Sequence, residues 1–245
     1  MRNLRLLVAY AGTRYAGWQI QPGRQTVQGV LQVCVERVVR HPVKVVGASR
    51  TDSGAHASGQ VASLRTSSNL PADRLRSSLN GVLPPDIRVF ELVDAPEEFH
   101  ALGKAVRREY HYLVANGEVL SPFRNGFAHW VRAPLDRGLL REAARRILGE
   151  HDFAGFAGAD RGDVRTRRRV EISDWGEEED LLRYRVVADG FVRGMVRALV
   201  GTFLEVGRGR RHPDWVDEIL RARDRRLAGP CVPAHGLYLR RVDYA

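Results

Sequence analysis

The sequence is short of several residue types, and each shortage argues against a class of protein. It holds only two cysteines, Cys34 and Cys231, which are too few for a disulfide framework and lack the CxxC spacing of a zinc site. No stretch approaches the roughly 18 apolar residues that are needed to cross a bilayer. The histidines lack the HExxH spacing of a metal site, and neither common phosphate-binding loop occurs. We therefore expect a cytoplasmic protein that uses no membrane anchor, no metal and no nucleotide cofactor.

Lysine is also scarce, because only Lys44 and Lys104 stand among the 39 basic residues. With 29 acidic residues the formal net charge is +10, which predicts an anionic partner. The planar fork of arginine suits phosphate groups and base edges, but a genome rich in G and C produces the same bias without any function. The sequence leaves both explanations open.

Length and hydrophobic periodicity predict the architecture. The 245 residues, 44% of them hydrophobic, are enough for one large domain or two small ones. Apolar residues recur at helical spacing after Thr26, a candidate N-cap, and again from Val192 to Leu204, with Gly207 as the expected stop. Further helices are expected over 71–79, 136–148 and 213–222. Strands are expected over 4–10, 43–46, 60–64, 87–92, 109–115, near 170, over 182–188 and over 236–242.

Each half of this pattern has roughly the order β-α-β-β-α-β, although no sequence repeat connects the halves. We therefore predict an α+β fold of two split-βαβ, ferredoxin-like subdomains over residues 1–102 and 103–245. The two are expected to join into one mixed, mainly antiparallel sheet, with helices mainly on one face and an active-site cleft at the seam.

The loop Ser-Arg-Thr-Asp-Ser-Gly-Ala-His-Ala, residues 49–57, places Asp52 directly after an expected buried strand. The end of a strand holds the backbone rigidly and leaves side chains free to face a cleft, so Asp52 is a candidate catalytic carboxylate. The same residues also fit an Asx-turn, in which Asp52 caps its own backbone and Arg50 is a solvated neighbour. The spacing alone favours the turn.

Arg193 and Arg197 are four residues apart, so they share one face of the expected helix beside its apolar positions. Snorkelling into solvent is the commoner outcome for such a cation. If Arg197 meets Asp52 across the seam, however, its guanidinium would keep a partly buried carboxylate ionised and oriented, as a nucleophile or base requires.

Two further segments combine arginine with other features. In the strand over 107–112, alternation puts Arg108, Tyr110 and Tyr112 on one side. Rings beside arginines can support a nucleobase, although core packing is the more usual role of strand tyrosines. The run from Arg161 to Arg169 holds five arginines in nine residues and is a candidate phosphate contact or an ordinary solvated surface.

At the Asp52 loop the sequence closely resembles the TruA family of tRNA pseudouridine synthases, whose signature there is G-R-T-D-A-G-V-H-A. The resemblance extends over essentially the whole chain in separate segments that stand in the right order. These segments are 10–19 (YAGTRYAGWQ), 26–28, 79–84 (LNGVLP), 99–101, 149–153 (GEHDF), 195–197 (MVR), 206–207 and 236–239 (GLYL). The departures from the family pattern are Ser49, Ser53 and Ala55 in the signature, Arg193 where His is common and Ala198 where Asn is common.

The resemblance implies an isomerase, an intramolecular transferase that converts uridine to pseudouridine at positions 38, 39 and 40 in the anticodon stem-loop of tRNA. It implies no cofactor and no metal, and a homodimer in which each tRNA touches both subunits. Asp52 matches the catalytic aspartate, and Arg197 matches its basic partner. Tyr110 matches the tyrosine that stacks on the target base, and Arg50 matches the arginine that helps to displace that base.

This chemistry fits the residue types. The N1–C1′ bond must break, the uracil must turn and C5 must bond to C1′, so Asp52 would attack C1′ or take a proton from C2′, and the sequence leaves both paths open. Tyr110 would hold the detached ring, and its hydroxyl could serve in the later removal of the C5 proton. Flipping the base out of its stem requires phosphate contacts, for which Arg165, Arg167 and Arg193 are candidates.

Two other functions stay open on the residues alone. A non-catalytic RNA-binding module would account for the basic balance and the arginine-tyrosine strand without using Asp52. A hydrolase with Asp52 as its nucleophile lacks both a metal site and a second well-placed carboxylate. Isomerisation of uridine in bound tRNA distinguishes a synthase from a pure binder.

Overall fold

The computed structural model describes residues 1–158 and 165–245, so Arg161 of the basic run lies outside the described residues. The chain divides into two compact units. Unit 1 comprises Met1–Arg108 together with Tyr238–Ala245, and unit 2 comprises Glu109–Leu237. The division expected from the sequence lay near residue 102 and placed the end of the chain in the second subdomain, whereas the structure groups the last eight residues with unit 1.

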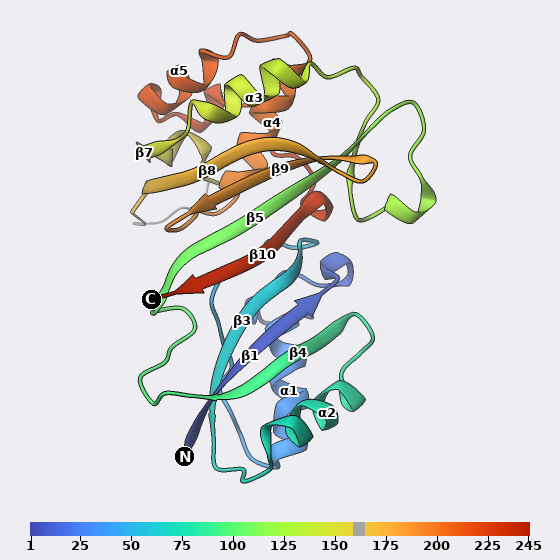
Figure 1. Cartoon of the computed structure of the whole chain (residues 1–245), viewed down its shortest axis with the longest axis vertical. Helices are drawn as coiled ribbons and strands as arrows, with labels where there is room; N and C mark the ends of the chain where they lie inside the picture. Colours follow the sequence, from blue (N-terminus) through green and yellow to red (C-terminus); the bar gives the residue numbers. More distant parts are fainter. Residues whose placement is uncertain (159–164) are drawn as a thin grey trace. The chain divides into compact units, whose positions relative to one another are not determined.

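Unit 1 has the order β-α-β-β-α-β that the sequence predicts, followed by one strand from the end of the chain (Figure 1). Its strands lie in the order β4-β1-β3-β10, and the short β2 pairs with β3. β1 is antiparallel to both β3 and β4, whereas β10 is parallel to β3. The elements are β1 (Arg2–Tyr10), α1 (Val27–Val39), β2 (Val46–Gly47), β3 (His56–Thr66), α2 (Ala72–Val82), β4 (Ile87–Ala95) and β10 (Leu237–Tyr244).

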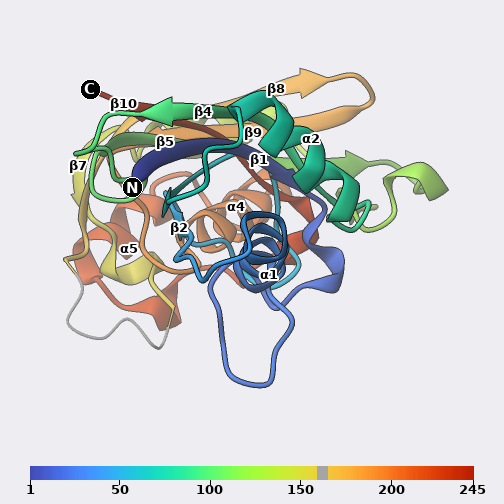
Figure 2. The same ribbon diagram turned by 90° about the horizontal axis from the view of Figure 1, so that it is seen from below.

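Helix α1 begins and packs as its sequence predicts. The Thr26 side chain accepts a hydrogen bond from Gly29 N at 3.3 Å, which confirms the expected N-cap. Val27, Leu31 and Val35 are fully buried and recur at helical spacing, so one face of the helix enters the core. The helix lies on one side of the strands of unit 1 (Figure 2).

Unit 2 has its strands in the order β5-β9-β8-β7, with β6 beside β5. β8 is antiparallel to β7 and β9, and β6 is parallel to β5. β6 and β7 were not expected, because strands of three and four residues show too little alternation to be recognised. The elements are β5 (Ala105–Asn116), β6 (His129–Val131), α3 (Arg137–Arg145), β7 (Gly149–Asp152), β8 (Arg167–Glu178), β9 (Leu181–Ala188), α4 (Met195–Gly207) and α5 (Trp215–Ala222).

Helix α4 starts later than its apolar pattern indicates. The pattern runs from Val192, but the helix begins at Met195 because Gly194 has a φ of +74°, in the left-handed region. Every residue of α4 except Arg197 and Glu205 is buried, which makes α4 the central helix of unit 2. The helix ends at Gly207, the stop that the sequence predicts.

Mostly antiparallel strands with a few parallel pairs, together with helices that pack on them, confirm the predicted α+β class. The cleft at the seam between the halves stays a prediction. Within the part of the chain that the structure describes, no helix combines the length and the apolar character that a membrane span requires.

Candidate active site

Asp52 lies in a tight turn between β2 and β3. Ala55 N donates to Asp52 O at 3.1 Å, and Gly54 at the third position of the turn has a φ of +82°, which glycine adopts without strain. The Asp52 side chain is half-buried and that of Arg50 is exposed. We call residues 49–55 the aspartate turn. Its closing hydrogen bond joins main-chain atoms, so a change of the Asp52 side chain leaves that bond in place.

A second loop, the glycine segment over residues 12–18, holds the aspartate turn. Gly54 N and Ser53 Oγ both donate to Tyr15 O, each at 3.2 Å. Trp18 N donates to Thr51 O at 3.2 Å. The turn is therefore bonded to the glycine segment on both sides of Asp52.

Two glycines allow this close approach of one main chain to another. A Cβ on Gly17 would lie 2.5 Å from Thr51 O, and a Cβ on Gly12 would lie 1.8 Å from Ala55 O. Gly17 also has a φ of +88°. The resemblance to the family includes this segment, but no role for it was expected from the sequence. The sequence signal for this close approach was the pair Gly12 and Gly17, which stand near buried aromatic residues in the chain.

The start of the aspartate turn is fixed to β3 by Gln60, whose side chain is completely buried. Gln60 Oε1 accepts from Ser49 N at 3.2 Å, and Gln60 Nε2 donates to Ser49 O at 2.7 Å. Next to it, Ala48 N donates to Val61 O at 2.8 Å. The side-chain amide of Gln60 thus bonds the main-chain N–H and C=O of Ser49, as a neighbouring strand would.

Tyr15 joins the aspartate turn to the residue before β4. Its hydroxyl donates to Asp86 Oδ1 at 2.7 Å, and Arg14 donates to Asp86 Oδ2 through two nitrogens at 2.9 and 2.6 Å. Burial and the bond to Asp86 raise the pKa of Tyr15 to about 12. Burial alone would raise the pKa of Asp86, but the hydrogen bonds from Tyr15 and Arg14 outweigh it and hold the pKa below its usual value. At neutral pH the pair is a phenol and a carboxylate.

In unit 2, two tyrosines of β5 are buried on one side of the strand. Tyr110 is 4% exposed and meets Phe191 edge-on, with ring centroids 5.0 Å apart at 81°. Tyr112 is completely buried, and its hydroxyl donates to Pro233 O at 2.7 Å. Burial raises the pKa of the Tyr112 hydroxyl, which is therefore neutral at any physiological pH.

Arg197 of α4 is held by the chain that leads to β10. Its Nε donates to Val232 O at 2.7 Å, and Val232 N donates to Arg197 O at 3.3 Å. The same stretch of chain passes directly over α4, because a Cβ on Gly201 would lie 1.7 Å from Pro230 O. The Arg197 side chain is half-buried and anchored at Nε, so its guanidinium has a set orientation rather than the free snorkelling of a surface cation.

A charged cluster that was not expected from the sequence lies on the side of β5 away from Tyr110. Arg185 Nε donates to Glu109 Oε1 at 2.8 Å, and His111 Nε2 lies 2.8 Å from the same oxygen. Burial alone would raise the pKa of Glu109, but the hydrogen bonds from Arg185 and His111 lower it below its usual value. Glu109 is therefore ionised, and the cluster ties β5 to β9 next to Tyr110.

The candidate RNA contacts lie at the surface of unit 2. Arg165 and Arg193 are exposed. Arg167 begins β8 and lies 3.5 Å from Glu150 in an exposed ion pair, which contributes little to stability and is open to exchange for a phosphate. The main chain of Arg193 is fixed, since Gly158 N donates to Arg193 O at 2.9 Å.

The predicted site residues fall into two groups. Asp52 and Arg50 belong to unit 1, and Tyr110, Arg193 and Arg197 belong to unit 2. The pairing of Asp52 with Arg197 stays a prediction. Among the described residues no group of three or more His, Cys, Asp or Glu side chains is placed to hold a metal ion.

Comparison with known proteins identifies the class. The sequence model of the tRNA pseudouridine synthase family matches residues 6–102 and 143–245. A protein of Exiguobacterium sp. named tRNA pseudouridine synthase A is 41% identical over 247 residues, which cover 100% of this chain and 98% of that one. A protein of the same name from Myxococcus xanthus is 42% identical over 248 residues, covering 100% of this chain and 92% of that one. These matches define an isomerase of the pseudouridine synthase class. The chain belongs to the tRNA pseudouridine synthase family, as the resemblance implied.

Proposed function

We propose that this protein converts uridine to pseudouridine at positions 38, 39 and 40 in the anticodon stem-loop of tRNA. Family membership supports the reaction. The aspartate turn is the observation that supports a role for this chain's own residues. Asp52 is half-buried and occupies the position of the family's catalytic aspartate, and the main chain around it is hydrogen-bonded to Tyr15 and Trp18. A carboxylate that reacts at one carbon atom of a ribose must be held in a defined position, and these main-chain bonds provide that support.

The reaction needs no co-reactant, because substrate and product are isomers. The N1–C1′ bond breaks, a C5–C1′ bond forms, C5 loses its proton and N1 gains one. On one path the Asp52 carboxylate bonds to C1′ as N1 leaves and departs again when C5 attacks. On the other path it takes the C2′ proton and returns it after the ring has turned. Both paths require Asp52 to be ionised at the start.

The other residues would serve orientation and charge. Arg197, anchored to Val232 O through Nε, would direct its terminal nitrogens toward the Asp52 carboxylate and orient it. Tyr110, steadied by the edge of Phe191, would hold the detached uracil and serve in removal of the C5 proton. Arg50 is exposed, so it is able to enter the RNA stem and take the place of the displaced base.

Binding of a whole tRNA calls for a wider surface. We propose that the protein works as a homodimer in which each tRNA contacts both subunits, and that Arg165, Arg167 and Arg193 bind phosphates. The net charge of +10 supports an anionic partner. The free thiols of Cys34 and Cys231 suit work in the reducing cytoplasm. A doubling of the 27.5 kDa chain mass in light scattering is expected, and a monomer at working concentration with full activity would contradict the dimer.

The experiment that tests the function is incubation of the purified protein with unmodified tRNA transcripts, followed by carbodiimide mapping of pseudouridine. Matched transcripts carry cytidine at one of the three positions. We expect pseudouridine at 38, 39 and 40 and its loss at each position that holds cytidine. Tight binding of tRNA without any pseudouridine would favour the non-catalytic RNA-binding module instead.

A further inference from the structure

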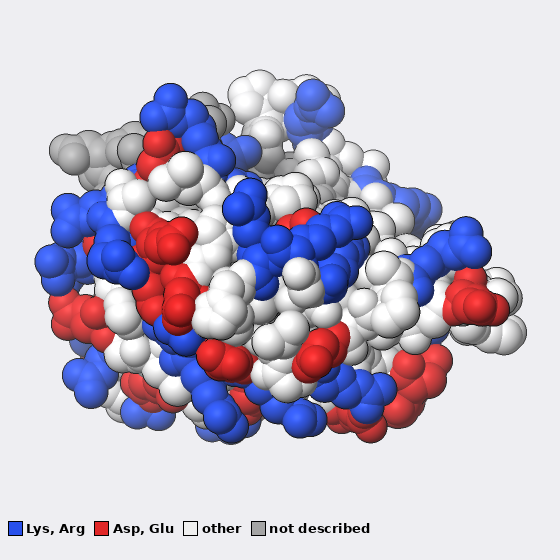
Figure 3. All heavy atoms as spheres, turned by 90° about the horizontal axis from the view of Figure 1, so that it is seen from above, with Lys and Arg blue, Asp and Glu red and all other residues white. Residues whose placement is uncertain are grey.

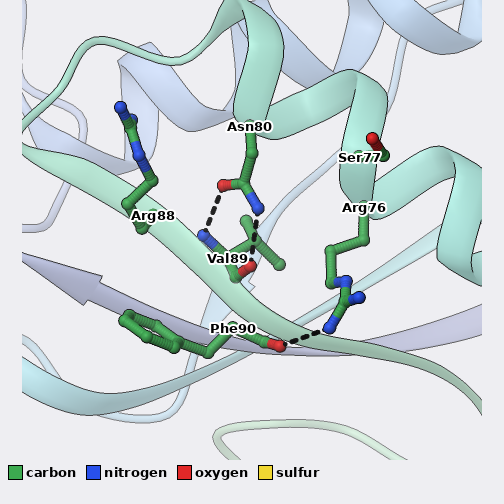
Figure 4. A pocket seen from close by; sticks show the side chains of 6 residues that line it. All are labelled: Arg76, Ser77, Asn80, Arg88, Val89 and Phe90. Carbon is green, nitrogen blue, oxygen red and sulfur yellow. Dashed lines mark hydrogen bonds between the residues drawn. The ribbon is translucent and has the colours of Figure 1, made fainter.

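A hollow of about 380 Å³ lies between α2 and β4 of unit 1 (Figure 4). Its volume is within the range of ligand-binding pockets, roughly 300–1,000 Å³. We call it the α2–β4 hollow. The residues that line it are Arg76, Ser77 and Asn80 from α2 and Arg88, Val89 and Phe90 from β4.

Side chains of α2 fix the walls of the hollow by bonding to the main chain of β4. Asn80 Nδ2 donates to Val89 O at 2.8 Å, and Asn80 Oδ1 accepts from Val89 N at 2.9 Å (Figure 4). Arg76 donates to Phe90 O at 2.9 Å. Since β4 is an edge strand of unit 1, these bonds satisfy main-chain groups that would otherwise face solvent. These bonds join α2 to β4 at the hollow.

The two guanidinium groups of the hollow are held by neutral carbonyls. Arg88 donates through one terminal nitrogen to Pro84 O at 2.6 Å and to Ile87 O at 2.7 Å. Among the described residues, no carboxylate lies within ion-pair distance of Arg76 or Arg88. Figure 4 shows the two guanidinium groups on opposite sides of the pair formed by Asn80 and Val89. Each cation is held in place without a carboxylate partner in the described part of the chain, so each is able to bind a separate phosphate.

A different arrangement occurs on the helices of unit 2. There Arg146 forms ion pairs with Glu142, Asp214 and Asp217. Red and blue side chains are interspersed on the face seen from above (Figure 3). Arginine is common throughout this chain, so the number of arginines says little. The absence of acidic partners at the α2–β4 hollow is the informative feature.

An exposed aromatic ring completes the hollow. Phe90 is 61% exposed, which leaves most of a large apolar ring in water on the edge strand that also carries Arg88. A ring next to fixed guanidinium groups can stack on an unpaired base while the cations bind the adjoining phosphates. The hydroxyl of Ser77, which lies on α2 next to Arg76, is an additional hydrogen-bond partner at the hollow (Figure 4).

Residues next to the hollow are hydrogen-bonded to residues that hold the aspartate turn. Arg88 pairs with Ala9 at the end of β1, and Ala11 N donates to Asp86 O at 3.0 Å. Asp86, two residues before Arg88, accepts the hydroxyl of Tyr15, whose carbonyl holds the aspartate turn. The hollow and the aspartate turn are therefore linked through β1, Asp86 and Tyr15.

We propose that the α2–β4 hollow binds the phosphate backbone of the tRNA substrate, with Arg76 and Arg88 as its cations and Phe90 stacked on a neighbouring base. This inference rests on the proposed function, because it takes tRNA to be the ligand. It adds a contact outside the residues that the family resemblance supplies, on the same unit as Asp52.

The test compares two neighbouring serines of α2. Ser77 and Ser78 are both exposed, but adjacent positions on a helix point about 100° apart, and only Ser77 lines the hollow. In Ser77→Glu a carboxylate stands on α2 beside Arg76, where it competes with phosphate for that cation and repels phosphate from the hollow. We expect the Kd for unmodified tRNA, measured by filter binding, to rise about tenfold and its salt dependence to fall by about one phosphate contact.

Ser78→Glu is the matched control, since it changes net charge and helix composition equally. Its Kd is expected to stay within about twofold of wild type, and thermal melting should be the same for both variants. Equal Kd values for the two variants would overturn the proposal. The proposed function fails separately: it falls if wild-type protein makes no pseudouridine, whereas active wild type with equal binding of both variants contradicts the hollow alone.

Discussion

The two groups of site residues are held in position by different means. In unit 1, main-chain bonds from Tyr15 and Trp18 support the turn that carries Asp52. In unit 2, Arg197 is positioned by a bond from its own side chain to Val232 O, and Tyr110 by the packing of its own ring. The side chain of Asp52 can therefore be exchanged with the turn's main-chain support in place, whereas a change of Arg197 also removes what positions it.

The largest effect away from Asp52 itself is expected from Gly17→Ala. The new Cβ would meet Thr51 O at 2.5 Å and force the glycine segment away from the aspartate turn. A misplacement of about 1 Å can cost about 100-fold in rate, so we expect turnover of tRNA to fall by that order. The measurement is single-turnover conversion, with urea unfolding to record stability.

Gly23→Ala is the control for this substitution. Gly23 also has a positive φ, of +67°, but a Cβ there meets nothing within 4 Å. In both variants the left-handed backbone of the new alanine should lower the free energy of unfolding by about 1 kcal/mol. Only Gly17→Ala should lose activity. Equal activity of the two variants would mean that the close approach of the main chains does not position Asp52.

An intermediate effect is expected for Arg197→Lys. Lysine keeps the charge but has no planar fork to bond Val232 O and a carboxylate together, so turnover should fall about tenfold to 100-fold. Arg145→Lys, at an exposed position of α3, is the comparison and should stay near wild type. Wild-type kinetics for Arg197→Lys would show that Arg197 acts away from the reacting atoms.

The smallest effect concerns the link from Tyr15 to Asp86 and depends on pH. The pKa of Asp86 is depressed in the folded state, so its stabilising contribution is present above the unfolded value, near 3.9, and is lost as pH falls through the folded value. At pH 7, Asp86→Asn should be less stable than wild type by about 1–2 kcal/mol.

This difference should shrink as pH falls below about 4, because wild-type Asp86 then becomes protonated as well. Urea unfolding of both proteins over pH 3 to 7 measures it. A gap that stays constant with pH would mean that the charge of Asp86 is not what the bonds from Tyr15 and Arg14 stabilise.

Much of the fold follows from local pattern. The periodic apolar residues after Thr26 predict α1, and the order of elements in unit 1 is as expected, since both signals lie within short stretches of chain. The start of α4 was placed too early because periodicity does not show the left-handed Gly194. The grouping of Tyr238–Ala245 with unit 1 depends on strand pairing between distant segments, which no local signal reports.

The candidate site divides in the same way. The resemblance supplies Asp52, Tyr110 and Arg197 by motif, and these roles stay predictions. What supports them was not visible in the sequence: the bonds of Tyr15 to the aspartate turn and to Asp86, and the bond of Arg197 to Val232, join residues far apart in the chain. In the sequence, only Gly12 and Gly17 indicated that the main chain of the glycine segment lies close to another main chain.

The most direct test of the central claim, that Asp52 performs the chemistry on a turn supported by main-chain hydrogen bonds, is Asp52→Asn. Asparagine keeps the size of the side chain but can neither attack C1′ nor take a proton. We predict unchanged thermal melting and tRNA binding within about threefold, with pseudouridine formation reduced by at least about 1,000-fold in carbodiimide mapping. Wild-type turnover by Asp52→Asn would contradict the account.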